Sequence, residues 1–165
     1  MTKALIIVAF ALAASSSLVL AGTGSATNAR CQAGTTTFGG SPARVFCGPA
    51  TATVRVGSKT FTFRSGSCDK TSDYLTVNLG TIVIGSPSMP TPDYFGLTVG
   101  RLPLGGGKPA AKDGTYAGAV ISAVHAGKSY AIGQARVTLA GGRTRGTFTG
   151  QLALSSTKVS GSFAC

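Results

Sequence analysis

Four cysteines carry the clearest chemistry in this sequence, because paired thiols oxidise to disulfides outside the reducing cytosol. They are Cys31, Cys47, Cys68 and Cys165. Four cysteines allow three pairings, which the sequence alone does not distinguish. Proximity along the chain favours a Cys31–Cys47 disulfide, which leaves Cys68 to pair with Cys165. The C-x-x-C spacing of zinc ligands and redox dithiols does not occur, so neither a metal site nor a redox site is predicted.

The other residues capable of acid–base chemistry are one histidine and four aspartates. His125 lies in a predicted turn, and a general base also needs an orienting partner and a nucleophile, which no G-x-S-x-G motif supplies. Asp69, Asp73, Asp93 and Asp113 adjoin turn-forming residues, where carboxylates stabilise turns. Hydrolases bury one acid of a carboxylate pair, which turn aspartates do not favour, so a hydrolytic site is disfavoured. Calcium takes roughly six to eight oxygen ligands, and the region of Asp69 and Asp73 offers few charged ones, so a calcium site there is also disfavoured. We predict no catalytic residue.

The segment Gly105-Gly106-Gly107-Lys108 has the composition of a phosphate-binding loop. Its spacing does not fit, because the P-loop motif requires a glycine where Leu102 stands and a serine or threonine where Pro109 stands. No helical pattern follows whose N-terminus could bind a phosphate. No cofactor is therefore predicted.

Positive charge is the most prominent compositional feature, since 15 lysines and arginines stand against four acidic residues, for a net charge of +11. Such an excess attracts polyanions. For an exported protein these are acidic wall polymers or anionic lipid head groups, and a protein partner is also considered. Nucleic acid is the less favoured partner, because its readers interleave basic residues with exposed aromatics. The phenylalanines here fall on predicted core faces.

Arginines on predicted strands form the candidate polyanion-binding residues. Arg143 and Arg145 are two residues apart and are expected to project from one strand face. If the strands are neighbours, a basic stripe forms from Arg55, Arg64, Arg136, Arg143 and Arg145. The alternative interpretation is that the scattered charge only keeps the surface solvated.

The N-terminus has the organisation of a secretory signal peptide. Lys3 supplies the positive charge, and residues 5–20 are almost all apolar or small. Cleavage is expected after Ala21 or Ala29. We predict a signal peptide over 1–29 and a single disulfide-linked β-domain over 30–165, with no transmembrane span after cleavage. The first cysteine does not directly follow the apolar stretch, as an acylated cysteine would, so the protein is expected to be secreted or associated with the cell wall.

Short β-type segments separated by glycine and proline fill the rest of the chain. Strands are predicted over 51–56, 59–64, 74–79, 81–84 and 94–99, and a four-stranded meander over 115–124, 128–139, 143–154 and 158–164. Residues 31–47 are a Gly/Thr/Ser-rich segment for which no strand is predicted, and residues 85–93 hold three prolines and cannot form a central strand. Residues 100–114 are interpreted as a long loop. Val137 and Leu139 are out of phase with Tyr130 and Ile132, which predicts a β-bulge near Gly133. The fold class is all-β, an antiparallel sandwich or partly closed barrel.

Residues 53–165 resemble the actinobacterial lipoprotein antigen family of the mycobacterial LpqH type. The resemblance is carried by ATVRVGSKTFTFRSGSC (52–68), YLTVNLG (74–80), YFGLTVG (94–100), KDGTYAG (112–118), KSYAIGQA (128–135) and VSGSFAC (159–165). It implies a compact, non-catalytic β-domain on a bacterial surface and a Cys68–Cys165 bridge. The sequence lacks the family's acylated cysteine, and Cys31 and Cys47 are additional, so the family's receptor-agonist role is not carried over.

The sequence therefore predicts a non-enzymatic envelope-associated or secreted domain that binds anionic envelope material or a protein through a basic surface. A structural or antigenic surface protein without a specific ligand is the alternative. A hydrolase using aspartates is a third and least favoured hypothesis.

Overall fold

The structure is a computed structural model and describes residues 31–85, 87–101 and 108–165. The predicted signal peptide and the glycine triplet 105–107 lie outside the described residues. Eleven strands and no helix form in the described part of the chain. In order these are β1 (Gly34–Phe38), β2 (Ser41–Phe46), β3 (Thr51–Val56), β4 (Lys59–Arg64), β5 (Gly66–Lys70), β6 (Tyr74–Val83), β7 (Tyr94–Gly100), β8 (Gly114–His125), β9 (Lys128–Ala140), β10 (Arg145–Leu152) and β11 (Lys158–Ala164).

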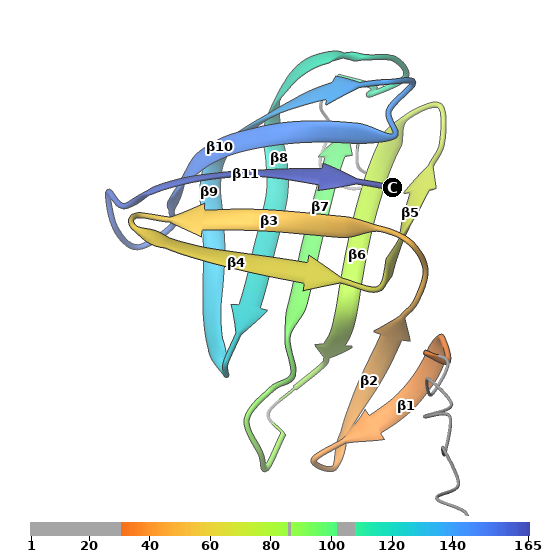
Figure 1. The fold of residues 1–165 in the computed structure, drawn as a ribbon, viewed down its shortest axis with the longest axis vertical. Helices are drawn as coiled ribbons and strands as arrows, with labels where there is room; N and C mark the ends of the chain where they lie inside the picture. Colours follow the sequence, from red (N-terminus) through yellow and green to blue (C-terminus); the bar gives the residue numbers. More distant parts are fainter. Residues whose placement is uncertain (1–30, 86, 102–107) are drawn as a thin grey trace, which may run out of the picture.

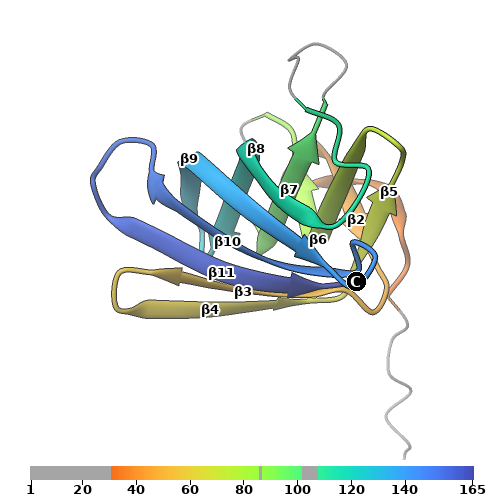
Figure 2. The same ribbon diagram turned by 90° about the horizontal axis from the view of Figure 1, so that it is seen from above.

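The strands form one antiparallel sheet that folds over on itself into two layers. Its order is β1-β2-β6-β7-β8-β9-β10-β11-β3-β4, and β5 also pairs with β6. Strands β10, β11, β3 and β4 make a front layer that crosses the back layer of β6 to β9 (Figures 1 and 2). The sheet is not closed into a barrel. The predicted all-β antiparallel fold, with a meander from β8 to β11, is confirmed.

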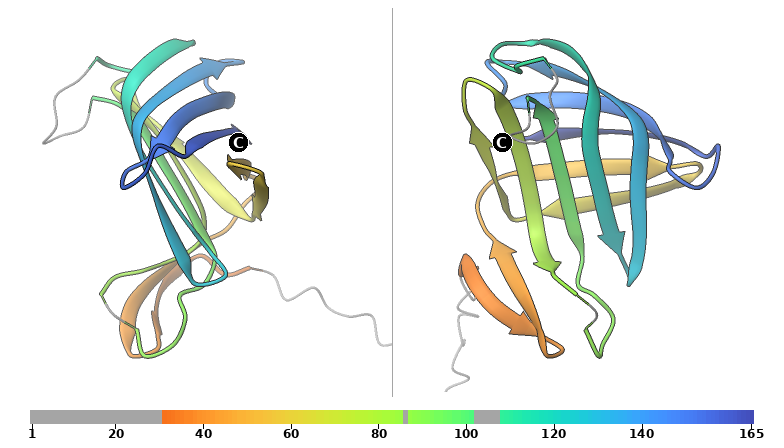
Figure 3. Two further views of the ribbon diagram at one scale, coloured as in Figure 1. Left: turned by 90° about the vertical axis from the view of Figure 1, so that its left-hand side faces the viewer. Right: turned by 180° about the vertical axis from the view of Figure 1, so that it is seen from behind.

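One bent segment carries the chain from the front layer to the back layer. Strand β4 ends at Arg64, Ser65 adopts a left-handed φ of 63°, and β5 then pairs with β6. The β1–β2 hairpin lies at one end of the back layer, where β2 pairs with β6 (Figure 3). The described segments contain no apolar helix of a length that could cross a membrane.

The N-terminal strands and part of the meander differ from the sequence prediction. Residues 31–47, where no strand was predicted, contain β1 and β2. Strand β1 was missed because its side chains are exposed on both faces and show no alternation. Strand β2 buries only the small side chains of Ser41 and Ala43, which give no strong apolar pattern. Strand β5 was missed for lack of apolar residues. The two segments predicted over 74–84 are one strand, β6, which continues through Gly80 at a φ of 78°. Strand β10 ends at Leu152, and Leu154, expected on the core face, is fully exposed.

The core lies between the two layers and is built around three phenylalanines. The Phe95 ring of β7 lies 5.7 Å from the Phe63 ring of β4 and 5.8 Å from the Phe148 ring of β10, centroid to centroid. All three side chains are buried. Aromatic pairs at such separations contribute beyond the area they bury, so these contacts hold the two layers together.

In the front layer, phenylalanines pack reciprocally over glycines of the neighbouring strand. Phe148 of β10 is paired with Gly161 of β11, and Phe163 of β11 with Gly146 of β10. A Cβ at Gly146 would lie 2.8 Å from the Phe163 ring, and one at Gly161 would meet the Phe148 ring. Only glycine therefore leaves room for each ring, and the two pairs define the register of β10 against β11.

The β-bulge that the sequence predicted near Gly133 is present in β9, and it divides this strand between the two layers. Along β10 the partner changes from Arg136, opposite Thr149, to Gly133, opposite Gln151. Gln134 has a left-handed φ of 49°. The extra residue of the bulge shifts the alternation of inward and outward side chains by one position. Ile132 before the bulge and Val137 after it are therefore both buried, although they are an odd number of residues apart.

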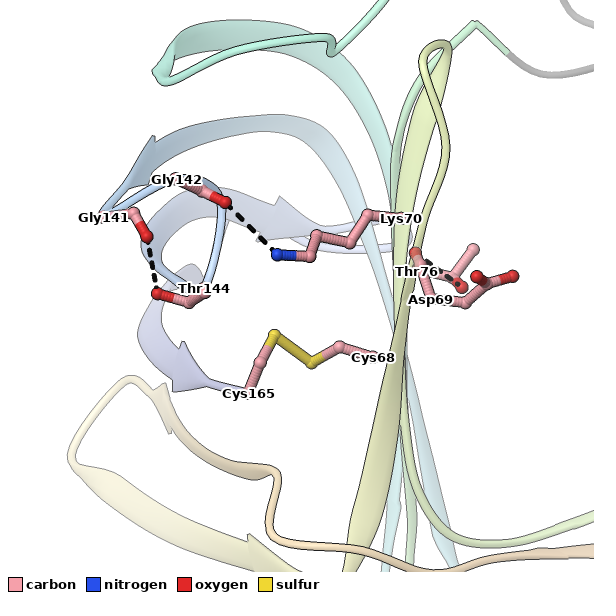
Figure 4. The surroundings of a disulfide bond; sticks show 8 residues. All are labelled: Cys68, Asp69, Lys70, Thr76, Gly141, Gly142, Thr144 and Cys165. Atoms are coloured by element: carbon pink, nitrogen blue, oxygen red, sulfur yellow. Dashed lines mark hydrogen bonds between the residues drawn. A yellow bond between two sulfur atoms is a disulfide. The ribbon is translucent and has the colours of Figure 1, made fainter.

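Both predicted disulfides are present, Cys31–Cys47 and Cys68–Cys165, with Cα atoms 5.7 and 5.6 Å apart. The first joins the two ends of the β1–β2 hairpin. The second joins β5 of the back layer to the residue that follows β11 in the front layer (Figure 4). Two disulfides indicate an oxidising environment.

Replacing Gly161 with alanine should destabilise the fold by about 1–3 kcal/mol, because the new methyl group would overlap the Phe148 ring and the Thr53 carbonyl. Urea unfolding followed by fluorescence or circular dichroism measures the loss. The matched control is Gly133→Ala, since a Cβ there has its nearest neighbour at 3.8 Å. Equal stability of the two variants would contradict the proposed packing.

Removing the Cys68–Cys165 bridge should cost more stability than removing Cys31–Cys47. The bridges span 97 and 16 residues, and loop entropy assigns them about 4.7 and about 3 kcal/mol. We expect the Cys68→Ser/Cys165→Ser variant to unfold at lower urea than the Cys31→Ser/Cys47→Ser variant. The reverse order would show that the hairpin bridge, and not the bridge between layers, limits stability.

Candidate functional site

The front layer presents a polar outer surface whose composition follows from strand periodicity. Inward positions of its strands hold the phenylalanines and glycines, so the alternate positions point away from the back layer. These outward residues, together with Thr115 of β8, are exposed or half-buried and are called the hydroxyl–arginine face. They are Arg136, Thr138 and Ala140 of β9; Arg145, Thr147, Thr149 and Gln151 of β10; Lys158, Ser160, Ser162 and Ala164 of β11; Thr51, Thr53 and Arg55 of β3; and Thr60, Thr62 and Arg64 of β4.

The centre of this face is an unbroken row of hydroxyl side chains that runs across six neighbouring strands. Successive members are directly paired from β8 to β4: Thr115, Thr138, Thr147, Ser162, Thr53 and Thr62. The first two hydroxyl oxygens, Thr115 Oγ1 and Thr138 Oγ1, are 2.9 Å apart and share a hydrogen bond. The row is a regular ladder of donors and acceptors that faces solvent.

Arginines lie in the rows on both sides of this hydroxyl ladder. On one side Arg136, Thr149, Ser160 and Arg55 are paired in succession. On the other side Arg145 and Arg64 are linked through Ala164 and Thr51. Three strand steps separate the two arginines of each row, which places their Cα atoms about 14 Å apart. The pairing thus brings four of the five arginines singled out from the sequence onto one face.

No acidic side chain balances these arginines on the face. The four aspartates of the sequence lie on β5 or in connections and not on β3, β4, β9, β10 or β11. Within the described residues, His125 and Asp93 are the one basic and acidic side-chain pair whose N and O atoms lie within 4.0 Å. Of the four arginines, Arg55 donates from Nε to the Gly57 carbonyl at 3.1 Å. Lys158 adds a fifth cation, so the face carries a net positive charge that attracts anions.

Arg143 is not part of the face. It lies in the turn before β10 with a left-handed φ of 62°, so the expectation that it projects beside Arg145 from one strand is wrong. Its guanidinium Nη1 donates to the Thr71 carbonyl at 2.6 Å and to the Ala110 carbonyl at 2.9 Å. Arg143 therefore holds three connections together and is occupied within the fold.

Two shallow grooves lie along the hydroxyl–arginine face. One, of about 490 Å³, is lined on the side of the Arg55 row by Arg55, Gln134, Thr149, Gln151, Lys158 and Ser160. The other, of about 440 Å³, is lined on the opposite side by Thr138, Arg145, Thr147 and Ser162. The second groove is also lined by Ala140, Gly146, Phe163 and Ala164, and apolar atoms make up most of the exposed lining of both grooves. A ligand lying in them would contact aliphatic parts of side chains as well as their polar groups.

His125 makes a closer partnership than its predicted exposed turn suggests. Its Nδ1 lies 2.8 Å from Asp93 Oδ2, and the Ala126 amide donates to Asp93 Oδ1 at 2.9 Å. The imidazole also packs on Phe61, with ring centroids 4.5 Å apart. Among the described residues, Asp93 is the hydrogen-bond partner of the His125 side chain. The pair joins the end of β8 to the segment before β7, and the stacking on Phe61 extends this contact to β4.

The fold places the other three aspartates, Asp69, Asp73 and Asp113, in different local surroundings. Asp69 lies on β5 and Asp73 in the turn before β6. Asp113 accepts hydrogen bonds from the amides of Gly142 and Arg143 at 3.0 and 2.7 Å. These bonds favour the charged carboxylate and hold the pKa of Asp113 below its ordinary value. Within the described ranges, no three His, Cys, Asp or Glu side chains gather as metal ligands would. Lys108, the lysine that follows the glycine triplet, is exposed.

Comparison of the chain with protein-family models, curated proteins and solved structures finds no match. The resemblance to the LpqH-type family stays a prediction.

Sequence reasoning identified the arginines of the face but missed its hydroxyl row. The signal was present as repeated alternation of polar side chains, in Thr51-x-Thr53-x-Arg55, Thr60-x-Thr62-x-Arg64 and Arg145-x-Thr147-x-Thr149. The sequence alone does not reveal that β11 pairs with β3, and this pairing joins the separate patterns into one surface.

The contact between Asp113 and the 142–143 turn should make part of the stability depend on pH. Because the pKa of Asp113 is lowered in the folded protein, this stabilisation is present above the unfolded value of about 3.9 and is lost as the pH falls through the folded value. We expect Asp113→Ala to lower the unfolding midpoint at neutral pH, with the difference from wild type vanishing in acid. Asp69→Ala is the control, and a loss for Asp113→Ala that persists unchanged in acid would rule out the carboxylate.

Proposed function

We propose that this protein is a secreted or cell-envelope-associated, non-enzymatic domain that binds anionic envelope material through the hydroxyl–arginine face. The observation that carries the proposal is the gathering of Arg55, Arg64, Arg136 and Arg145 on one acid-free surface. Arginine guanidinium groups pair well with carboxylates and phosphates, in a forked geometry. An anionic polymer would contact several of these groups at once.

The composition of the face favours a polymer over the other partners considered. Protein interfaces concentrate aromatic and apolar side chains at their centres, and single-stranded nucleic acid stacks its bases on exposed aromatics. The outward positions of this face hold hydroxyl, amide, cationic and alanine side chains, while Phe148 and Phe163 point into the core. The face can therefore form charge-assisted and neutral hydrogen bonds but offers no aromatic platform.

The proposed location rests on two features. The signal-peptide pattern of residues 1–29 directs export, and the two disulfides form in an oxidising compartment. A bacterial envelope is the setting that the LpqH-type resemblance implies, and acidic wall polymers are abundant anionic material there. A surface protein without a ligand is the competing function, and it is distinguished by binding measurements.

Replacing the four arginines of the face with glutamine should abolish most binding to anionic wall material. At roughly 0.5 kcal/mol for each exposed ionic contact, the Arg55→Gln/Arg64→Gln/Arg136→Gln/Arg145→Gln variant should bind about 30-fold more weakly. The assay is co-sedimentation of the purified protein with isolated cell-wall fractions at increasing salt. Wild-type binding should fall as salt rises, because exposed charges are screened.

The matched control removes the same amount of charge elsewhere. Arg101, Lys108, Lys112 and Lys128 are exposed and lie outside the face, so their replacement with glutamine should leave binding close to wild type. If both variants lose binding equally, net charge and not the face is responsible. If the wild-type protein does not sediment with wall material even at low salt, the proposal is overturned.

A further inference from the structure

We infer that the anionic ligand of the hydroxyl–arginine face is an acidic polysaccharide that lies across the strands, along the hydroxyl row. This inference rests on the proposed function and adds the chemical class of the ligand. It is carried by the juxtaposition of six paired hydroxyl side chains with two flanking rows of arginine.

A ligand recognised by charge alone would leave the hydroxyl row of the face without a binding partner. Binding a simple polyanion requires only cations, which are found at Arg136, Arg55, Arg145 and Arg64. Between them stands a continuous ladder of hydroxyls, which donate and accept hydrogen bonds equally. Sugar hydroxyls have the same dual character. A ligand that carries both carboxylates and hydroxyls would therefore satisfy both kinds of group.

The spacing of the face suits an extended chain that runs perpendicular to the strands. Neighbouring hydroxyls in the row are one strand spacing apart, about 4.8 Å, and the arginine rows lie about 6.8 Å to either side. A saccharide chain on the row would thus keep its ring hydroxyls over Thr147, Ser162 and Thr53. Its charged groups would reach Arg136 and Arg55 on one side, or Arg145 and Arg64 on the other.

The same face is poorly suited to the alternative ligands. Neutral sugars are commonly held by stacking on aromatic rings, and the rings nearest this surface, Phe148 and Phe163, are buried beneath it. A bilayer surface is bound by basic side chains together with apolar side chains that enter the acyl region. The exposed large apolar side chains of the described chain, Ile84, Met89, Val120 and Leu154, lie outside the face.

The test compares polymers that share charge but differ in hydroxyl content. Polygalacturonate carries carboxylates and hydroxyls, poly-L-glutamate carries carboxylates and backbone amides but no hydroxyls, and dextran carries hydroxyls but no charge. Phosphatidylglycerol vesicles supply an anionic lipid surface. Binding of the purified protein to each is measured by calorimetry or biolayer interferometry at one ionic strength. We expect polygalacturonate to bind at least fivefold more tightly than poly-L-glutamate at equal carboxylate concentration, and dextran not to bind.

Two variants locate the effect. Thr53→Val/Thr147→Val/Ser162→Ala removes hydroxyls from the centre of the row, and valine is well tolerated on strands. This variant should bind polygalacturonate roughly tenfold more weakly, since three hydrogen bonds are lost, and poly-L-glutamate unchanged. The matched control, Thr35→Val/Thr36→Val/Thr37→Val, removes three exposed hydroxyls from β1 and should bind both polymers as wild type does. Circular dichroism and unfolding midpoints verify that all variants fold.

The outcomes separate this inference from the proposed function. If wild type and the hydroxyl variant bind both polyanions equally well, the acidic-polysaccharide inference fails while polyanion binding stands. Tighter binding to vesicles than to polygalacturonate also overturns the inference, in favour of a lipid surface. If no polyanion binds, the proposed function fails and the inference falls with it.

Discussion

Close packing between phenylalanine rings and glycine backbones on adjacent strands determines the register of the front layer. Phe148 over Gly161 and Phe163 over Gly146 form a reciprocal pair of contacts that tolerates no shift. A slip of one residue would exchange the inward and outward side chains of a strand. The packing that fills the core therefore also decides which residues reach solvent, and the surface rows of arginine and hydroxyl groups depend on it.

Polar contacts at the sheet ends then connect the two layers to their loops. Arg143 and Asp113 join the β9–β10 turn to two other connections, and the Asp93–His125 pair does the same at the opposite end of β8. The Cys68–Cys165 disulfide adds a covalent link between the layers. These groups are titratable or redox-active residues that a search for catalysis would select first. In this fold they hold connections together, whereas the hydroxyl–arginine face gathers four arginines that, within the described residues, form no ion pair.

The strands with clear apolar alternation and the bulge of β9 could be predicted from sequence, because each follows from a local pattern. The sequence alone did not fix the disulfide pairing, although proximity along the chain favoured the pairing that is observed. Strands β1 and β5 could not, since they bury little and show no period of two. Only the arginines of the hydroxyl–arginine face could be predicted from the sequence, and their arrangement on one surface could not. Its arginines stand out by charge, but pairing of β11 with β3 joins residues about a hundred positions apart, and no local signal specifies it. Arg143 was misplaced because its left-handed backbone removes it from the strand.

The regular repeat of the hydroxyl row has a further consequence. Thr138, Thr147, Ser162, Thr53 and Thr62 are near-equivalent steps on one lattice, so a polymer shorter or longer than the row can occupy several overlapping positions. Each position adds to the number of bound states, which favours association statistically even where single contacts are weak. A chain held in this way can translate by one strand at a time without leaving the protein, and the domain would then move along its ligand instead of marking one point on it.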